Sequence, residues 1–221
     1  YCPAPKIPFV INLASSDNDI LEKSVSHVAN SLELSGLHKL RHYAVHMGFL
    51  IDPKPSQLGN TLKKEKLNSR SKSLDIFFDS IHKLSEVAKK NEVKLLIENN
   101  VITKKNISQF GSNPLLGTNF DDIDEIMKNV PDNIGLLLDV AHLNVSCKTL
   151  DLDRIKEIKC LTEYTEGYHI SDNDGFTDSN SPINSKSWFL PFIEKSIDYK
   201  VLEVYEYNPE SLKKQISLLI K

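Results

Sequence analysis

Apolar residues along this chain follow two alternating patterns. Short continuous apolar runs end at a polar residue, as residues 135–139 do at Asp139, and the segments between them carry apolar residues at helical spacing. A run of this length predicts a strand covered on both faces, whereas a 3.6-residue spacing predicts an amphipathic helix. Six segments fit the strand pattern: residues 9–13, 43–47, 93–97, 135–139, 168–172 and 201–205.

Helix signals lie between these strands. Residues 15–17 can cap a helix that Gly36 ends, and Asn208 and Pro209 open the last helix. A core-facing stripe marks another helix: Leu74, Phe77, Phe78, Ile81, Leu84 and Ala88. Further helices are expected over residues 118–130 and 151–160 and from about residue 187. This alternation predicts an α/β domain with a parallel sheet and right-handed crossovers.

Charged or imidazole side chains fall at or near the ends of four successive strands. They are Glu98, Asp139, His169 and Glu203. A closed barrel would bring all four to one mouth, because the carboxyl ends of parallel strands meet there. One such residue is ordinarily structural, but four in consecutive strands predict a site for one divalent cation. Oxygen-rich ligation with one nitrogen suits Mn²⁺, Mg²⁺ or Co²⁺ and also accommodates Zn²⁺.

Composition and charge narrow the classes of protein that fit. The chain has 221 residues, of which 40% are hydrophobic, so it can bury the core of one domain. A net charge of -3 disfavours nucleic acid as a partner, and no apolar run is long enough to cross a membrane. Cys2, Cys147 and Cys160 lack paired spacing, which favours reduced thiols and a cytoplasmic location. A homo-oligomer stays open.

The order of these motifs resembles that of the xylose-isomerase-like TIM barrels, a family of sugar isomerases and epimerases and of endonuclease IV-type abasic-site nucleases. The resemblance spans the chain and rests on residues 8–15, 97–99, 138–142, 169–175 and 202–203. It implies that Glu98, Asp139, His169 and Glu203 are metal ligands.

The resemblance also implies a fold, a (β/α)₈ TIM barrel. Residues 9–13 match the third strand of that barrel, so its first two β/α units are expected to be missing ahead of Tyr1. Residues 1–221 would then form a single TIM-barrel-like domain that corresponds to strands three to eight. A six-stranded open variant is the alternative.

Departures from the family pattern favour one branch over the other. The nucleases build a three-metal cluster with extra histidines, and Lys6 and Asn180 stand where two of these should fall. A lysine ammonium repels a cation, and an amide is a weak ligand for Zn²⁺. Residues that match other cluster or motif positions are expected to contact substrate instead: His46, His142, Asp178 and Asn12. This favours a one-metal enzyme acting on a sugar or sugar phosphate.

The predicted reaction is isomerisation or epimerisation by proton transfer. The cation would bind the carbonyl and adjacent hydroxyl of an open-chain sugar and stabilise an enediolate, while Glu98 and Glu203 act as base and acid. His142 would orient a substrate hydroxyl. Hydride-shift isomerases of the family carry Glu-Pro-Lys on the fifth strand, whereas this chain has Glu98-Asn99-Asn100, so proton transfer is preferred.

Three other functions stay open at this stage. They are a metal-dependent dehydratase or lyase that uses the same intermediate, an abasic-site endonuclease with a degenerate metal cluster, and a non-catalytic binding protein on the same fold. The sugar itself cannot be named, because specificity would lie in loops such as residues 52–60 and 175–187.

Overall fold

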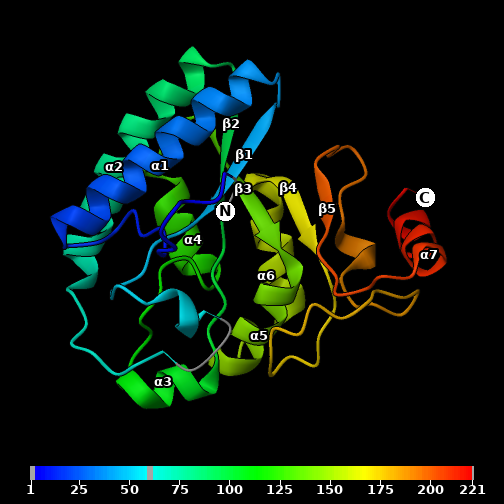
Figure 1. Ribbon diagram of the computed structural model, residues 1–221. Helices are drawn as coiled ribbons and strands as arrows, with labels where there is room; N and C mark the ends of the chain where they lie inside the picture. Colours follow the sequence, from blue (N-terminus) through cyan, green and yellow to red (C-terminus); the bar gives the residue numbers. More distant parts are fainter. Residues whose placement is uncertain (1–2, 59–61, 221) are drawn as a thin grey trace.

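Five parallel strands form a curled half-barrel (Figure 1). The computed structural model describes residues 3–58 and 62–220. The strands follow one another in chain order across the sheet: β1 (His42–His46), β2 (Lys94–Glu98), β3 (Ile134–Asp139), β4 (Thr165–Ile170) and β5 (Lys200–Leu202). Because every neighbouring pair is parallel, all five carboxyl ends lie at the same edge.

Helices connect the strands and pack against them. Helices α1 and α2 lie side by side against β1 and β2, and α5 packs against β3, β4 and α6 (Figure 1). The α-helices are α1 (Asn18–Leu37), α2 (Arg70–Lys90), α3 (Lys104–Phe110), α4 (Phe120–Met127), α5 (Val140–Leu150), α6 (Arg154–Leu161) and α7 (Pro209–Leu219). No helix within the described ranges is long and apolar enough to span a membrane.

Polar caps start the predicted helices. Asp17 accepts hydrogen bonds from two first-turn amides of α1, and Asn208 does the same for α7. Each cap pairs backbone donors that have no partner inside the helix. The stripe predicted on α2 is confirmed, because five of its six residues are buried and Phe78 packs partly buried against the core.

Strand β3 lies in the middle of the sheet and is the most deeply buried. Every residue from Ile134 to Asp139 is buried, which confirms the run that predicted a strand covered on both faces. Leu136 and Leu138 belong to one core cluster together with Leu95 and Ile97 of β2 and with Phe77 and Ile81 of α2. The carboxyl ends of the strands are therefore supported by a tightly packed core at the centre of the sheet.

Residues 9–13 do not form a strand, so that part of the prediction was wrong. Backbone groups of this segment bond to side chains instead: Asn12 N donates to Ser24 Oγ at 3.0 Å, and Leu13 O accepts from Ser80 Oγ at 2.9 Å. The apolar residues of the run, Val10, Ile11 and Leu13, are buried all the same. The hydrophobic pattern predicted their burial correctly but not their pairing.

Other boundaries also differ from the prediction. Helix α5 follows β3 without a loop and α3 lies in a segment that the sequence suggested was irregular. The helix expected from residue 187 is reduced to a 3₁₀ turn, η3 (Leu190–Phe192), where Pro191 cannot continue a helix. Cys147 and Cys160 are free thiols, whereas Cys2 and residues 59 and 60 of the predicted specificity loop lie outside the described ranges.

Two glycines with left-handed backbone test how tightly the loops above the strands are packed. Around Gly111 (φ 74°) the space that a Cβ would occupy is open, whereas a Cβ on Gly117 (φ 65°) would clash with Met47 Sδ. We expect Gly111→Ala to lower the free energy of unfolding by about 1–2 kcal/mol from backbone strain alone. Gly117→Ala should cost about 1–3 kcal/mol more, because the buried methionine must move. Urea unfolding of both variants measures the difference, and equal losses would show that Met47 yields freely.

Candidate metal and substrate site

Strand register brings the predicted ligands to one place. His46 pairs with Glu98 across β1 and β2, and Asp139 pairs with His169 across β3 and β4. Glu203 directly follows Leu202, which pairs with Ile170. One ligand atom from each of Glu98, Asp139, His169 and Glu203 lies within 4.8 Å of the others. The structure therefore brings together the four side chains that the strand ends singled out.

His169 lies between the two glutamates. Its Nδ1 is 3.0 Å from Glu98 Oε1 and 2.9 Å from Glu203 Oε2. Glu98 comes from β2 and Glu203 from just beyond β5, on opposite sides of β4, so they approach His169 from two directions. The Glu98 side chain is 7% exposed and that of Glu203 is 44% exposed. The Glu98 carboxylate is thus held inside the protein, and the Glu203 carboxylate is partly open to solvent.

Asp139 serves both the helix and the site. Its Oδ1 accepts hydrogen bonds from Ala141 N and His142 N, both at 2.8 Å, and so caps α5. Its Oδ2 is left toward the site, 3.8 Å from His142 Nε2. Burial raises the pKa of Asp139 to about 6, with a further contribution from the negative charge of Glu98. One oxygen is therefore structural and the other is available to a ligand.

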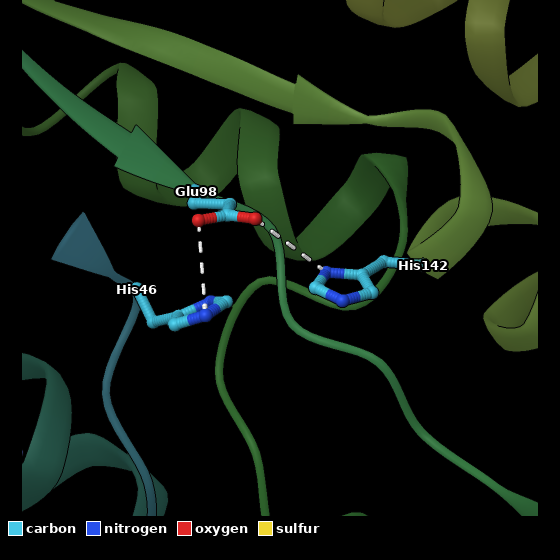
Figure 2. A group of neighbouring side chains, drawn as sticks. All are labelled: His46, Glu98 and His142. Carbon is cyan, nitrogen blue, oxygen red and sulfur yellow. Dashed lines mark ion pairs between the residues drawn. The ribbon is translucent and has the colours of Figure 1, made fainter. Parts of the chain in front are cut away.

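A second group surrounds the other side of Glu98. The carboxylate lies between two imidazoles, with Oε2 3.7 Å from His46 Nε2 and Oε1 3.8 Å from His142 Nδ1 (Figure 2). Burial raises the pKa of Glu98, but His46, His169 and His142 outweigh it and hold that pKa at about 2. Glu98 is thus a carboxylate facing three imidazoles.

The electrostatics of the two groups differ. Burial lowers the pKa of His46, and the neighbouring imidazoles of His142 and His169 lower it further. Burial also lowers the pKa of His169, but hydrogen bonds with Glu203 and Glu98 raise it to about 10. A proton on His169 thus offsets part of the negative charge that the clustered carboxylates create.

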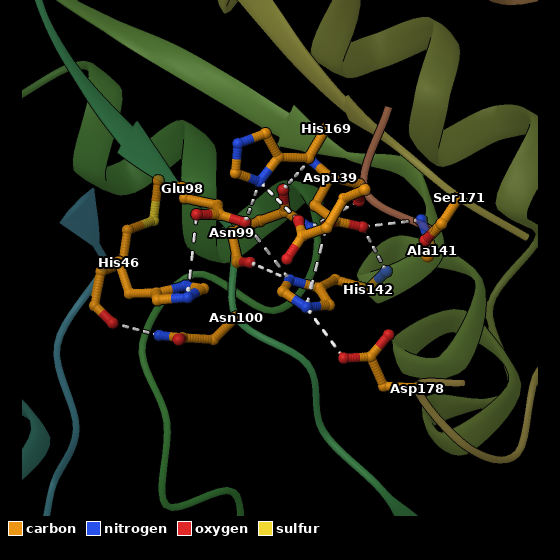
Figure 3. A network of polar contacts seen from close by, with 12 residues as sticks. His46, Glu98, Asn99, Asn100, Asp139, Ala141, His142, His169, Ser171 and Asp178 are labelled. Carbon is orange, nitrogen blue, oxygen red and sulfur yellow. Dashed lines mark hydrogen bonds and ion pairs between the residues drawn. The ribbon is translucent and has the colours of Figure 1, made fainter. Parts of the chain in front are cut away.

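His142 connects the site to the loop that follows β4. Its Nδ1 lies 2.9 Å from the carbonyl oxygen of Asn99, and its Nε2 lies 3.2 Å from Asp178 Oδ2. Both partners are acceptors, so both ring nitrogens donate. Burial lowers the pKa of His142, but Asp139, Asp178 and Glu98 raise it well above its ordinary value. Figure 3 shows His142 within this network, beside Asp178.

Two asparagines after Glu98 hold the site edge, and sequence reasoning did not assign them a role. Asn99 bonds to Asp139 in both directions: Asp139 N donates to Asn99 Oδ1 at 2.7 Å, and Asn99 Nδ2 donates to Asp139 O at 3.0 Å. Asn100 Nδ2 donates to the carbonyls of Met47, Gly48 and Leu116. The only sequence signal was the pair of amides directly after a buried strand.

Asn12 is placed differently from the other predicted substrate contacts. Its buried Nδ2 donates to Ile51 O at 2.9 Å and Asp52 Oδ1 at 2.7 Å, and its Oδ1 accepts from Phe49 N at 2.9 Å. The amide is therefore engaged in holding the loop after β1. Contact between Asn12 and a substrate stays a prediction.

The two positions that depart from the nuclease pattern have other surroundings. Lys6 is exposed. Asn180 is buried in a left-handed conformation (φ 44°), and its Oδ1 accepts a hydrogen bond from Ser171 Oγ at 3.2 Å. Asparagine tolerates this conformation better than most residues, which accounts for an amide at position 180. Neither residue belongs to the two groups of candidate ligands in the described part of the chain.

The donor set fits a divalent cation. Three carboxylates and one imidazole offer hard oxygen ligands and one nitrogen, and three of the four side chains are mostly buried. Carboxylates this close repel one another in a site of low polarity, and a bound cation would compensate that charge. The fold and these side chains together define a parallel half-barrel with a candidate metal site at the carboxyl ends of its strands.

Comparison with known proteins places the chain in a family. The model of the xylose isomerase-like TIM barrel family matches residues 1–203, so the chain belongs to that family. This confirms the resemblance read from the motifs, and the five-stranded half-barrel corresponds to part of the eight-stranded fold.

Individual relatives are distant. A probable endonuclease 4 from Persephonella marina is 22% identical over 179 residues, which are 80% of this chain and 47% of that protein. The chain thus spans about half the length of this curated relative. A D-tagatose 3-epimerase-like protein superposes with a TM-score of 0.69 at 20% identity, covering 96% of this chain and 76% of the other.

A further solved structure bears on the metal. A xylose isomerase-like TIM barrel protein from Mycobacterium smegmatis, in complex with magnesium, superposes with a TM-score of 0.62 at 17% identity and covers 93% of this chain and 69% of the other. Other solved structures of similar fold include an L-ribulose 3-epimerase, a D-psicose 3-epimerase and a 3-keto-D-glucoside 4-epimerase from E. coli. At these identities the likeness establishes the fold, and the activity has to be argued from the site.

Asn99 offers a test of how the site edge is held. We expect Asn99→Ala to lower the free energy of unfolding by about 2–4 kcal/mol, because it leaves buried groups of Asp139 unpaired. It should also weaken divalent-metal binding about 10–100-fold, since the side chain positions a candidate ligand. Isothermal titration with Mn²⁺ and urea unfolding give the two readouts.

The matched control is Asn91→Ala. Asn91 follows α2 near the amino end of β2, and its Nδ2 donates to Val87 O at 2.8 Å. It should lose some stability and keep its metal affinity. If Asn99→Ala also keeps its metal affinity while losing stability, Asn99 supports the fold and does not position the site.

Proposed function

We propose that this protein is a divalent-metal-dependent isomerase or epimerase of open-chain sugars or sugar phosphates. The observation that carries the proposal is the arrangement of Glu98 and Glu203, two carboxylates that come from opposite sides of β4 and both contact Nδ1 of His169. An epimerase needs a base on one face of a carbon and an acid on the other, and we assign these two roles to the pair.

The chain's own residues would divide the work. Glu98, Asp139, His169 and Glu203 would hold the cation, which when bound supplies positive charge to the substrate carbonyl and acidifies the neighbouring carbon. Glu98, fixed inside the site, would take or return a proton on one face of that carbon. Glu203, more open to solvent, would do so on the other face.

The second group would orient the substrate. His142 donates through both ring nitrogens, and the 3.2 Å contact of its Nε2 with Asp178 lies at the margin of the site. A substrate hydroxyl placed there could bond to both residues. His46 Nδ1 is buried and has no hydrogen-bond partner among the residues that the structure describes, so it too could bond to a ligand.

A second candidate function rests on the endonuclease relative. His46, Glu98 and His142 form another group of potential metal ligands, as a nuclease with several metals would need. Lys6 and Asn180 argue against a full cluster, because neither offers a histidine nitrogen. A dehydratase or lyase would use the same proton abstraction, and a binding protein would use none.

Replacement of either glutamate tests the proposal. With saturating Mn²⁺ and a panel of ketoses and aldoses, Glu98→Gln and Glu203→Gln should each slow solvent-deuterium exchange at the substrate α-carbon by about 10²–10⁴-fold. The amide keeps the shape and one oxygen donor but lacks a basic carboxylate. Proton NMR follows the exchange, and metal titration verifies loading.

Glu166→Gln is the matched control. Glu166 is 44% exposed, as Glu203 is, but it pairs with Lys94 at the amino end of the sheet. It should exchange at the parent rate. If the metal-loaded Glu98 and Glu203 variants also exchange at that rate, the glutamates are ligands only. If the metal-loaded parent exchanges no proton with any sugar of the panel, a binding function replaces the proposal.

A further inference from the structure

A cavity of about 550 Å³ lies beside the candidate site. Its walls come from the loop after β1, from α3 and the segment before it, from the carboxyl-terminal end of α5 and from the loop after β4. This volume is within the range of pockets that hold small molecules. The described lining of the cavity lies within residues 3–58 and 62–220.

Asp178 joins this cavity to the candidate site. It lines the cavity, and its Oδ2 lies 3.2 Å from His142 Nε2. The other ring nitrogen of His142, Nδ1, lies 3.8 Å from Glu98 Oε1. A substrate that reacts at Glu98 could therefore extend past His142 into the cavity.

Side-chain hydrogen bonds hold the walls of the cavity in place. Ile102 N donates to Ser146 Oγ at 3.1 Å, which ties the segment before α3 to α5. Asn144 Nδ2 donates to Asn173 Oδ1 at 2.8 Å, and Asn173 Nδ2 donates to Ala141 O at 2.8 Å, which tie the loop after β4 to the same helix. These bonds fix how far apart the walls lie.

The charges that line the cavity are mainly positive. Lys104, Lys105 and Lys148 all contribute, and no ion pair joins any of them to a carboxylate of the described chain. Lys148 Nζ lies 5.3 Å from the ring centroid of Phe176, another lining residue. Asp178, at the end next to His142, is the one carboxylate in the lining. Thr103, Thr149 and Thr177 add hydroxyl groups.

We infer that this cavity binds the phosphate group of a phosphorylated open-chain sugar whose carbonyl end lies at Glu98. The inference rests on the proposed function and specifies its substrate class. Lysine ammonium groups and hydroxyls bind phosphate oxygens through charge-assisted hydrogen bonds. A chain with a net charge of -3 that gathers three lysines around one small cavity provides a local field for an anion. The size of the cavity favours a small phosphomonoester over a nucleic-acid strand.

Paired ligands test the inference. Isothermal titration of the Mn²⁺-loaded protein should show that D-fructose 6-phosphate binds at least about tenfold more tightly than D-fructose, and that inorganic phosphate competes with it. Replacing all three lysines in Lys104→Gln/Lys105→Gln/Lys148→Gln should reduce the ratio of the two affinities about tenfold, since these lysines are exposed and each ammonium group contributes modestly. Affinity for D-fructose should not change.

A matched variant controls for net charge. Lys72, Lys83 and Lys90 are exposed on α2, away from the cavity lining, and replacing these three with Gln should leave the preference intact. Equal affinity of the parent for the two sugars, or an unchanged preference in the cavity variant, would overturn the inference. So would lysine-dependent binding of an abasic DNA duplex in preference to the sugar phosphate.

The outcomes also separate this inference from the proposed function. Binding of inorganic phosphate is measured again on protein stripped of metal with EDTA, where no proton transfer is required. If the parent protein binds phosphate but exchanges no α-proton, the isomerase proposal is wrong and the anion site remains. If the parent protein exchanges the α-proton of sugars at a rate that the triple lysine variant retains, and binds no phosphate, the isomerase proposal remains and the anion site is wrong.

Discussion

Like charges are held together here by the geometry of a parallel sheet. Five strands end at one edge, and the register across them sets His46 beside Glu98 and Asp139 beside His169. Isolated carboxylates would move apart, but Glu98 and Asp139 stand on strands whose leucines and isoleucines are fully buried. The packed core thus supplies the free energy that keeps three carboxylates within reach of one ion.

Buried amides stabilise this edge between the strands and the loops above them. Asn99 fastens the end of β2 to the end of β3, Asn100 fastens it to the loops after β1 and before α4, and Asn12 holds the loop after β1 from the other side. Each amide pairs with backbone groups at the end of a strand or in the loops beyond it. The site is therefore positioned by side-chain hydrogen bonds as much as by the sheet itself.

Much of the fold and of the candidate site could be predicted from the sequence, because the spacing of hydrophobic residues and the polar residues at strand ends are local signals. The buried run before Asp139, the stripe on α2 and the caps at Asp17 and Asn208 all appeared as expected. Residues 9–13 carry the same apolar signal without forming a strand, since pairing depends on a neighbour that the pattern does not contain. The contacts of Asn99 and Asn100 were equally hidden, because they join segments that are distant in the sequence.

We propose that Glu98, Asp139, His169 and Glu203 hold one divalent cation. Anomalous diffraction from crystals of the protein grown with Mn²⁺ tests this ligand set most directly. We expect one strong peak, about 2.0–2.3 Å from a donor atom of each of these four residues. Further peaks at His46 and His142, or a peak that none of the four residues contacts, would contradict it.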